Sequence, residues 1–424
     1  MAPARDERTA VVLSVGEELL AGDIRDTNRE EVAAALRGLG FDVRGLRTVG
    51  DGAEEIAEAV SAAAARASVV ILTGGLGPTE DDRTRHGLAR AASDELVFDE
   101  RELGRIADLF ARVGRAMSAS NRVQAYRPSR ARWIENRNGT AAGLRAEVAG
   151  ALVLALPGLP FEMRPMLEEV LLDDVVVRFG PGAAPPRAKV RAHGLSESIV
   201  GERVREFMGE GADPRVGITV SGGVLTVTAT SHAADRAAAE RAVEAVARTV
   251  EERLGPNVFG RGDVTLEEAT IAALRRAGRT CATAESCTGG LVSSLLTRVA
   301  GASDVFLEGC VTYSNAAKSA RLGVPAETIE RHGAVSEEVA RAMAEGIVRT
   351  SGASVGVSLT GIAGPGGGTD EKPVGLVWLG LRVDGVTHAR RVVLPGDRET
   401  VQLRAARTAL DLVRRGAEGT LAER

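Results

Sequence analysis

The chain has 424 residues, an ordinary hydrophobic content of 44%, few aromatic residues (3%) and a net charge of −5. The length predicts two or three domains, and the acidic balance argues against broad nucleic-acid binding, so no stable nucleic-acid complex is expected. The first residues, MAPARDERTA, are charged, and no run of about 18 apolar residues occurs, so we expect neither a signal peptide nor a membrane span.

Strands and helices alternate in the first predicted domain, residues 8–179. Runs of apolar and β-branched residues predict strands at 9–15, 41–49, 68–72 and 151–156, and helical periodicity is seen at 27–39, 52–65 and 161–172. This alternation is typical of a doubly wound α/β domain, in which ligands bind at the loops after the strands. Those loops are 16–18, 73–82 and 157–163.

The loop TGGLGPTEDDRT (73–84) contains most of the candidate functional residues of this domain. Gly75 and Gly77 allow a tight wrap after the strand, and Thr84 (or Thr79) can cap the next helix. Asp81 and Asp82 suit a divalent cation or an acid–base role. They can equally serve only to favour the helix N-terminus through its dipole.

Two other loops can contribute carboxylates to the same edge of the sheet. Glu17 or Glu18 can complete a cluster with the two aspartates, and Glu162 lies in the rigid loop PGLPFEM (157–163), where it can also act as a capping residue.

A proline- and glycine-rich linker, GPGAAPP (180–186), separates this domain from a small module at 187–256. The module's pattern is βαββα: strands at 188–193, 215–220 and 224–231, and helices at 196–208 and 233–254. We interpret it as a module that connects or dimerises the larger domains.

The last predicted domain, residues 263–416, is also α/β. It opens with a helix at 266–277 and a strand at 280–284, has a buried strand at 353–359, and closes with strands at 375–383 and 387–394 and a helix at 399–414. Cys281, Cys287 and Cys310 all lie here, and their spacing is typical of reduced thiols in a cytoplasmic protein. The five scattered histidines predict no zinc site and no Ser-His-Asp triad.

The motif AESCTGG (284–290) lies between a strand and an apolar helix. Ser286 is placed to act as a nucleophile, and the N–H groups of Thr288, Gly289 and Gly290 are expected to be unpaired at the helix start, where they suit an oxyanion or a phosphate. Ser286 or Thr288 can instead be a simple N-cap. Cys287 is a rival nucleophile.

Lys318 is unusual because only three of the 53 basic residues are lysines; the others are Lys189 and Lys372. A buried lysine can lose its proton, which arginine cannot do at accessible pH. Lys318 is therefore a candidate general base for Ser286, although a chance survivor in an arginine-rich chain would look the same.

The loop TGIAGPGGGT (360–369) follows the strand at 353–359. Gly364 and Gly366 allow the backbone to approach a ligand closely, although such a loop can also be a flexible surface segment. Lys372 is predicted to be a phosphate contact or a loop anchor. Arg398, at the start of the final helix, can bind a phosphate or lie solvated on the surface.

Four motifs in the last domain resemble the C-terminal domain of the CinA (competence/damage-inducible protein) family: AESCTGG, YSNAAKSARLGV, GAVSEEVARAMAEG and TGIAGPGGGTDEKPVG. The resemblance implies a nicotinamide mononucleotide amidohydrolase that needs no cofactor. It implies Ser286 as nucleophile and Lys318 as general base, assisted by Tyr313 and Thr360. It makes Arg398 a phosphate contact, with Arg404 as the alternative.

The N-terminal motifs VGEELLAGDIRDTN, TGGLGPTEDDRT, NRVQA and NGTA also match this family. The resemblance implies a molybdopterin-binding-like fold that hydrolyses ADP-ribose with a divalent cation (Mg, Mn or Co). Asp81 and Asp82 are the implied catalytic and metal-binding residues, with Glu17, Asn28 and Thr84 as weaker candidates. Ala142 departs from the proline expected after Gly-Thr-Ala.

The resemblance as a whole implies a bifunctional enzyme of pyridine-nucleotide salvage and a homodimer. Two alternatives remain open. One is a deamidase whose N-terminal domain only binds a nucleotide or pterin, and the other is an accessory protein in competence or the DNA-damage response.

Overall fold

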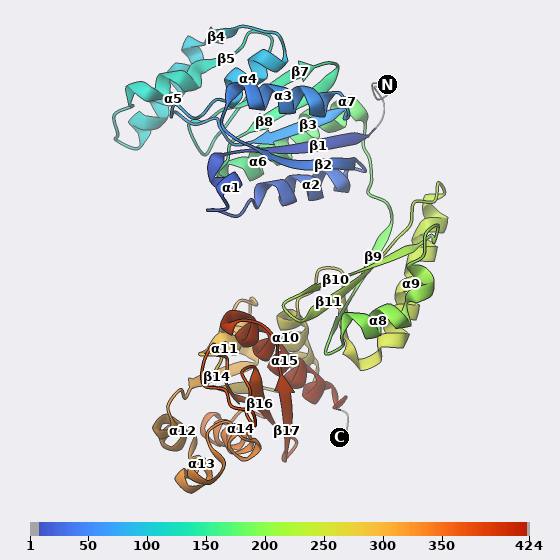
Figure 1. The fold of residues 1–424 in the computed structure, drawn as a ribbon, viewed down its shortest axis with the longest axis vertical. Helices are drawn as coiled ribbons and strands as arrows, with labels where there is room; N and C mark the ends of the chain where they lie inside the picture. Colours follow the sequence, from blue (N-terminus) through green and yellow to red (C-terminus); the bar gives the residue numbers. More distant parts are fainter. Residues whose placement is uncertain (1–7, 422–424) are drawn as a thin grey trace. The chain divides into compact units, whose positions relative to one another are not determined.

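The computed structural model describes residues 8–421 and divides into two compact units, the first ending at Ala184 and the second beginning at Pro185 (Figure 1). Each unit has its own hydrophobic cores. No helix within residues 8–421 combines the length and the apolar character that crossing a membrane requires.

The first unit is built on a six-stranded sheet of order β2-β1-β3-β8-β7-β6, in which β2, β1, β3 and β8 run parallel and β7 and β6 are antiparallel additions. Its strands are β1 (Thr9–Val15), β2 (Asp42–Val49), β3 (Val69–Thr73), β6 (Arg132–Ile134), β7 (Gly143–Val148) and β8 (Ala151–Leu156). Its helices are α1 (Glu17–Ala21), α2 (Asn28–Gly38), α3 (Ala53–Ala64), α4 (Thr84–Ala91), α5 (Glu100–Arg112), α6 (Pro160–Val170) and α7 (Val177–Phe179).

The central strands of this sheet are buried on both faces. Val11 and Leu13 of β1 pack in one core with α3, while Ala10 and Val12 pack in the other with α2 and α6. Coverage of both faces explains the continuous apolar runs in β1, β3 and β8. The predicted doubly wound fold is confirmed.

The segment between α4 and β6 contains elements that the sequence pattern did not predict. Strands β4 (Leu96–Phe98) and β5 (Tyr126–Pro128) form a separate antiparallel ribbon. Helix α5 lies between them in the chain and begins after Asp99, whose carboxylate accepts the N–H groups of Arg101 and Glu102. The three-residue strands give little periodicity to detect, whereas α5 carries apolar residues at helical spacing that the prediction did not use.

The middle module has a four-stranded antiparallel sheet of order β10-β11-β9-β12. Its elements are β9 (Arg187–His193), α8 (Glu197–Arg203), β10 (Arg215–Ser221), β11 (Val224–Thr230), α9 (Arg236–Leu254) and β12 (Val258–Arg261). The helix α8 is shorter than the predicted helix at 196–208, since it ends at Arg203. Strand β12 pairs with β9, so the sheet extends beyond residue 256.

The C-terminal domain has a five-stranded sheet of order β14-β13-β15-β16-β17. Its strands are β13 (Cys281–Glu285), β14 (Phe306–Val311), β15 (Val355–Gly361), β16 (Leu376–Val383) and β17 (Val386–Val393). Its helices are α10 (Leu266–Arg276), α11 (Leu291–Thr297), α12 (Asn315–Leu322), α13 (Ala326–His332), α14 (Glu337–Ser351) and α15 (Arg398–Glu418).

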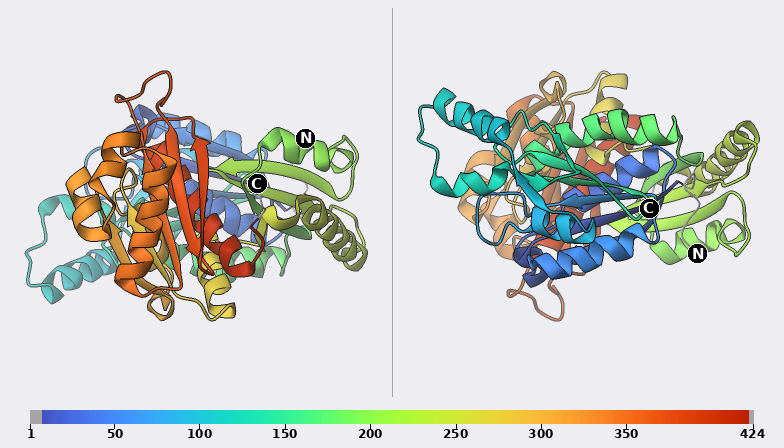
Figure 2. Two further views of the ribbon diagram at one scale, coloured as in Figure 1. Left: turned by 90° about the horizontal axis from the view of Figure 1, so that it is seen from below. Right: turned by 90° about the horizontal axis from the view of Figure 1, so that it is seen from above.

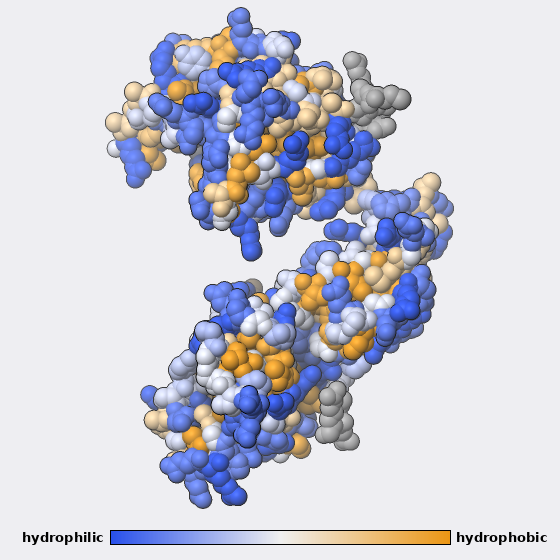
Figure 3. All heavy atoms as spheres, in the orientation of Figure 1, coloured by the Kyte–Doolittle hydropathy of each residue, from blue (hydrophilic) through white to orange (hydrophobic). Residues whose placement is uncertain are grey.

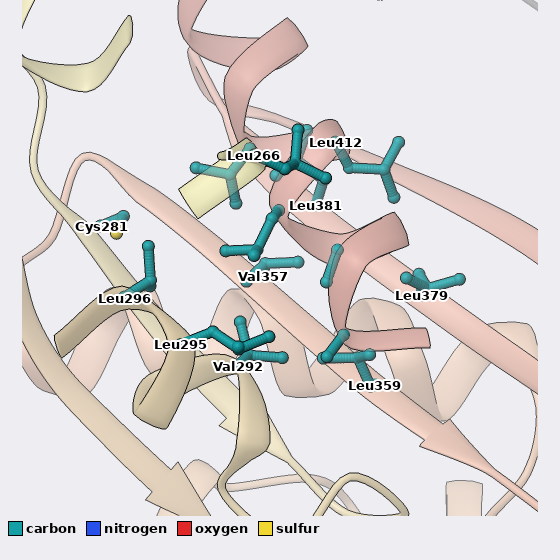
Figure 4. Packing of buried hydrophobic residues seen from close by; sticks show 14 of the residues in the cluster. Leu266, Cys281, Val292, Leu295, Leu296, Val357, Leu359, Leu379, Leu381 and Leu412 are labelled. Atoms are coloured by element: carbon teal, nitrogen blue, oxygen red, sulfur yellow. The ribbon is translucent and has the colours of Figure 1, made fainter. Parts of the chain in front are cut away.

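Helices cover both faces of this sheet, as the left view of Figure 2 shows for α14 and α15. Figure 4 shows the core on the α15 face, where Val292 and Leu295 of α11 pack near Val357 and Leu359 of β15. Polar residues cover much of the face seen in Figure 3, and apolar residues gather in patches on the middle module and on the C-terminal domain. The sheet thus forms a rigid base for the loops at its edge.

Candidate active site

Ser286 lies directly after β13, in the turn that leads to α11. Its N–H donates to the carbonyl of Leu359 on β15, at 3.0 Å, which holds the turn against the neighbouring strand. The side chain is 8% exposed and lines a pocket of about 230 Å³. The residue predicted as the nucleophile from the sequence therefore lines a pocket.

Lys318 reaches Ser286 from α12. Its Nζ lies 2.9 Å from Ser286 Oγ and 2.9 Å from the carbonyl oxygen of Thr312. The residue is only 1% exposed and forms no ion pair with any described residue. Burial without a carboxylate partner lowers the pKa of the Lys318 amine. This environment favours the neutral amine that a general base requires.

The turn after β13 is organised by Glu285, a fully buried carboxylate that sequence analysis missed. It accepts hydrogen bonds from the N–H groups of Gly290, Val292 and Ser293, and from the hydroxyls of Thr288 and Ser293. A carboxylate at this end of α11 satisfies the N–H groups that a helix start leaves unpaired. Glu285 lies within the motif AESCTGG (284–290), but its place at the end of a buried strand did not single it out as a site residue.

This arrangement corrects the predicted anion site. The N–H of Gly290 and the hydroxyl of Thr288 are committed to Glu285, and the N–H of Gly289 donates to the carbonyl of Ser286. None of the three residues lines the pocket. The predicted anion contacts through the N–H groups of Gly289 and Gly290 are not supported by this geometry, because both groups are engaged inside the protein.

Two other N–H groups of the turn are available instead. Within the described part of the chain, those of Cys287 and Thr288 donate to no acceptor, and Cys287 lines the pocket. The Cys287 thiol is less suited to attack, because burial raises its pKa to about 12. The geometry thus favours Ser286 as the nucleophile and the Cys287 N–H as its neighbouring donor.

Arg398 and Tyr313 stand together at the mouth of the pocket. One Arg398 Nη donates to the Tyr313 hydroxyl at 2.9 Å and the other to the carbonyl of Gly364 at 2.8 Å. Tyr313 is 63% exposed. Both residues line the pocket, as predicted, whereas Gly364 acts by anchoring the arginine. Gly366 is exposed and does not line the pocket, so its predicted contact stays a prediction.

Thr360 is buried at the pocket wall, and its hydroxyl donates to the carbonyl of Ala334 at 2.7 Å. Ala334 and Val335 come from the turn between α13 and α14, and Asn315 comes from α12. These three lining residues lie within two of the motifs shared with the family, but they were not predicted as site residues. They are brought to the site only by the packing of the helices.

Two predicted basic contacts lie elsewhere. Lys372 donates its Nζ to the carbonyl of His332 and does not line the pocket, which agrees with the anchoring alternative. Arg404 donates to the carbonyl of Pro395 and lines a different cavity. It follows Arg398 by six positions on α15, which places the two side chains on different faces of the helix.

The first unit has its own cleft, of about 460 Å³, at the carboxyl ends of β1, β3 and β8. Gly75 and Gly77 line it and are needed for close packing: a Cβ would lie 2.3 Å from Thr84 Oγ1 at Gly75, and 2.4 Å from Asp82 Oδ2 at Gly77. Thr84 is fully buried and donates to the carbonyl of Gly74. Its predicted ligand contact is therefore wrong.

The paired aspartates have different surroundings. Asp82 accepts the N–H groups of Gly77 and Thr79 and the hydroxyl of Thr79, so its carboxylate braces the loop. Asp81 is exposed and lines the cleft. Asp82 lines the cleft as well, so the metal role predicted for it stays a prediction beside its structural role in the loop.

A different pair of carboxylates accompanies Asp81. Glu18 and Asp51 line the cleft, whereas Glu17 does not. Burial and the negative charges of Glu18, Asp81 and Glu17 raise the pKa of Asp51. No group of three or more metal-binding side chains converges anywhere in residues 8–421. The carboxylates as arranged therefore do not fit a preformed metal site.

Polar groups from two other elements complete the cleft. Asn28 donates to the carbonyl of Gly158 at 2.6 Å, and its buried Oδ1 has no donor among the described residues. Glu162 also lines the cleft and accepts from the side chain of Asn136, and burial raises the Glu162 pKa. Asn28 thus offers an unused acceptor to a ligand.

These observations define a three-part α/β protein with a nucleotide-sized N-terminal cleft and a C-terminal serine–lysine pair. Family comparisons agree along the chain. The family "Probable molybdopterin binding domain" matches residues 11–176, "Damage-inducible protein CinA KH domain" matches residues 188–260, and "CinA C-terminal domain" matches residues 263–416.

The chain belongs to the CinA family. A CinA-like protein from Kosmotoga olearia is 41% identical over 406 residues, covering 96% of this chain and 98% of that protein. A CinA-like protein from Dictyoglomus thermophilum is 40% identical over 405 residues, with the same coverage. Among solved structures, the competence/damage inducible protein CihA from Agrobacterium tumefaciens is 44% identical, with a TM-score of 0.34, and covers 35% of this chain and 90% of that one.

Proposed function

We propose that the C-terminal domain is an amidohydrolase that converts nicotinamide mononucleotide to nicotinate mononucleotide and ammonia. The observation that carries the proposal is the 2.9 Å contact between Ser286 Oγ and Lys318 Nζ. This lysine is buried and has no carboxylate partner among the described residues. A hydroxyl next to a neutral amine forms an activated nucleophile without histidine or metal. The motifs shared with the CinA family supply the choice of substrate.

In the first half-reaction the C–N bond of the carboxamide breaks and Ser286 is acylated. Lys318 takes the proton of Ser286, and Oγ forms a bond to the carboxamide carbon. The negative charge that develops on the carboxamide oxygen is stabilised by the N–H of Cys287, and removal of such a donor costs about 3–4 kcal/mol of barrier. The C–N bond then breaks, and Lys318 returns its proton to the departing nitrogen, which leaves as ammonia.

The second half-reaction restores the enzyme. Lys318 takes a proton from water, hydroxide attacks the acyl carbon, and the bond to Ser286 breaks as the serine regains a proton. The product is nicotinate mononucleotide. The Thr360 hydroxyl donates its proton to the carbonyl of Ala334. Its oxygen can therefore accept a hydrogen bond from the carboxamide nitrogen of the substrate. Arg398 at the pocket mouth binds the phosphate, a role that suits a planar guanidinium.

The test is ammonia release from nicotinamide mononucleotide without added metal, using the wild type and Ser286→Ala. We expect release by the wild type only, with unchanged thermal melting. Ser294→Ala, which changes an exposed serine on α11, is the matched control and should keep full activity. Equal ammonia release by the wild type and Ser286→Ala would mean that Cys287 or another group, and not Ser286, is the nucleophile.

We propose, as a second activity, that the N-terminal domain hydrolyses the pyrophosphate bond of ADP-ribose with the help of Mg, Mn or Co. The supporting observation is the cleft at the strand ends, where Asn28 Oδ1 is unpaired and Glu18, Asp51 and Asp81 face the opening. Because these carboxylates do not form a three-ligand group, we assign no chemical step to the cation. The two activities together would recycle products of NAD breakdown.

Release of AMP from ADP-ribose, with and without the cations, tests this second activity. We expect cation-dependent release that Asp81→Asn reduces and Ser286→Ala leaves intact. Absence of AMP would leave a deamidase with a non-catalytic nucleotide- or pterin-binding domain. An accessory role in competence or DNA repair predicts salt-sensitive DNA binding instead. The expected homodimer is tested by sedimentation equilibrium, and the expected cytoplasmic location by cell fractionation.

A further inference from the structure

Gln402 of α15 contacts the turn that carries the proposed nucleophile. Its Nε2 donates a hydrogen bond to the main-chain carbonyl of Cys287 at 2.8 Å, across 115 positions of the chain. Gln402 itself does not line the Ser286 pocket. Its contact is therefore made to the residue that directly follows the nucleophile, and not to a bound substrate.

Cys287 lies between two peptide planes, and each plane is held through its carbonyl oxygen. The carbonyl of Ser286 accepts the N–H of Gly289 at 3.1 Å, and the carbonyl of Cys287 accepts the Gln402 amide. A peptide unit is planar and trans, so its N–H points opposite to its C=O. The bond from Gly289 therefore directs the Cys287 N–H away from Gly289. In the same way, the bond from Gln402 directs the Thr288 N–H away from α15.

The two N–H groups that are directed in this way have no acceptor inside the protein. Among the described residues, neither the N–H of Cys287 nor that of Thr288 donates a hydrogen bond. Such a donor stabilises an oxyanion best when its direction is fixed before the charge develops. Because the planes on both sides of Cys287 are held, both of its backbone dihedral angles are fixed. Loss of the Gln402 bond would free the second plane and let the turn relax.

The first two turns of α15 serve the turn and the pocket mouth from one side. Gln402 follows Arg398 by four positions, and residues at this spacing lie on the same face of a helix. Val401 and Ala405, on either side of this part of the helix, are buried in the core of the domain. Gln402 is thus presented to Cys287 from an element that is anchored by its packing.

We propose that Gln402 is a positioning residue: by holding the Cys287 carbonyl, it keeps the Cys287 N–H directed at the oxyanion that forms on the substrate. The inference rests on the proposed amidohydrolase function, because an oxyanion forms only when Ser286 attacks an acyl carbon. Loss of an oxyanion donor costs about 10²–10³ in kcat, so loss of a residue that only directs the donor should cost about tenfold. KM should change little, since the bound ground state carries no oxyanion.

The test compares Gln402→Met and Gln402→His in the full chain, with nicotinamide mononucleotide as substrate. Methionine is similar in length but has no hydrogen to donate, so kcat should fall by about tenfold at nearly constant KM. Histidine can place an Nε2–H donor at a similar distance from the backbone, so kcat should return to within about threefold of the parent value. Glu399→Gln, an exposed change in the first turn of α15, is the matched control and should keep the parent kcat.

Two further readouts separate positioning from a purely structural role. Gln402 is uncharged and lies outside the contacts of Lys318, so the inflection of the pH–rate profile should be the same in Gln402→Met and the parent. Thermal melting should also be nearly the same. If Gln402→Met does not fold, Gln402→Ala removes the same donor with a smaller side chain and takes its place in the comparison.

The same variants are assayed with para-nitrophenyl acetate, whose cleavage by Ser286 also passes through an oxyanion. Ser286 Oγ bonds to the acetyl carbon, the bond to the phenolic oxygen breaks, and para-nitrophenolate leaves. Cleavage of this ester without ammonia release from nicotinamide mononucleotide would contradict the proposed substrate only. The role of Gln402 would then be decided by the ester kinetics.

Several results would overturn the positioning role. These are an unchanged kcat in Gln402→Met with both substrates, a loss that lies wholly in KM, and an equal loss of kcat in Gln402→His or in Glu399→Gln. Absence of Ser286-dependent turnover of both substrates would overturn it as well, because no oxyanion would then form beside Cys287.

Discussion

Ser286 Oγ and Lys318 Nζ lie 2.9 Å apart, although 32 residues separate them in the chain. The two side chains meet because β13 ends beside the start of α12, and both are buried where they line the pocket. The second contact of Lys318, to the carbonyl of Thr312, fixes the direction of the amine. Removal of either member should therefore stop the proposed reaction without unfolding the domain.

Lys318→Arg should lower the turnover number for nicotinamide mononucleotide by about 10² or more, the usual scale for a general base. Arginine keeps the positive charge but cannot give up its proton at accessible pH. Steady-state ammonia release measures the effect. Lys189→Arg, a lysine paired with Asp263 on the middle module, is the control. Near-normal turnover in Lys318→Arg would remove the lysine from the mechanism.

The turnover number should rise with pH, because the active form of Lys318 is the neutral amine. Burial lowers the pKa of this lysine below the usual 10.5, so the inflection should fall below that pH. The group is neutral above its lowered pKa and protonated below it, so activity is lost as the pH decreases. A pH–rate profile measures this, and an inflection at or above pH 10.5 would contradict the assignment.

Glu285→Gln should destabilise the C-terminal domain by about 2–3 kcal/mol, since hydrogen bonds to charged groups are among the stronger ones. The Glu285 carboxylate accepts hydrogen bonds from the N–H groups of Gly290, Val292 and Ser293. In the glutamine variant the amide NH₂ would face some of these donors and could not accept from them. Urea unfolding measures the change, and ammonia release should fall with it as the Ser286 turn loosens. Glu308→Gln, at an exposed position on β14, should leave both unchanged.

Arg398→Gln should raise KM for nicotinamide mononucleotide by about tenfold or more, with a much smaller change in kcat, because a phosphate contact is made in the ground state and the transition state alike. Kinetics over a range of substrate concentrations separate the two constants. Arg331→Gln, an exposed change on α13, is the control. A fall in kcat at constant KM would assign Arg398 to the chemical step instead.

Asp82→Asn and Asp81→Asn should separate loop stability from cleft chemistry. Asp82 accepts three hydrogen bonds within its loop, and loss of this cap should cost about 1–2 kcal/mol. Exposed Asp81 should contribute little to folding. Thermal melting of both variants gives the comparison, and equal destabilisation would show that the two carboxylates share one structural role.

Much of the fold followed from local patterns. The apolar runs that became β1, β3 and β8 predicted buried strands, and the helical periodicity before β2 and β3 predicted α2 and α3. The β4–β5 ribbon escaped prediction because three-residue strands carry no clear period, whereas α5 was not predicted although its apolar residues Leu103, Ile106 and Phe110 recur at helical spacing. The predicted helix at 196–208 is an α-helix only as far as Arg203 and is followed by a short 3-10 turn at Arg205–Phe207.

The sequence by itself determined which side chains are candidates for the chemistry: Ser286 after a strand, one of three lysines at 318, and arginines near the last helix. Tertiary structure decided what each can do. It buried Lys318 without a counter-charge, engaged the N–H of Gly290 with Glu285 while leaving that of Cys287 unpaired, and placed Arg398 and Arg404 at different cavities. The physical reason is that desolvation and hydrogen-bond satisfaction depend on residues far apart in the chain, and no local pattern records them.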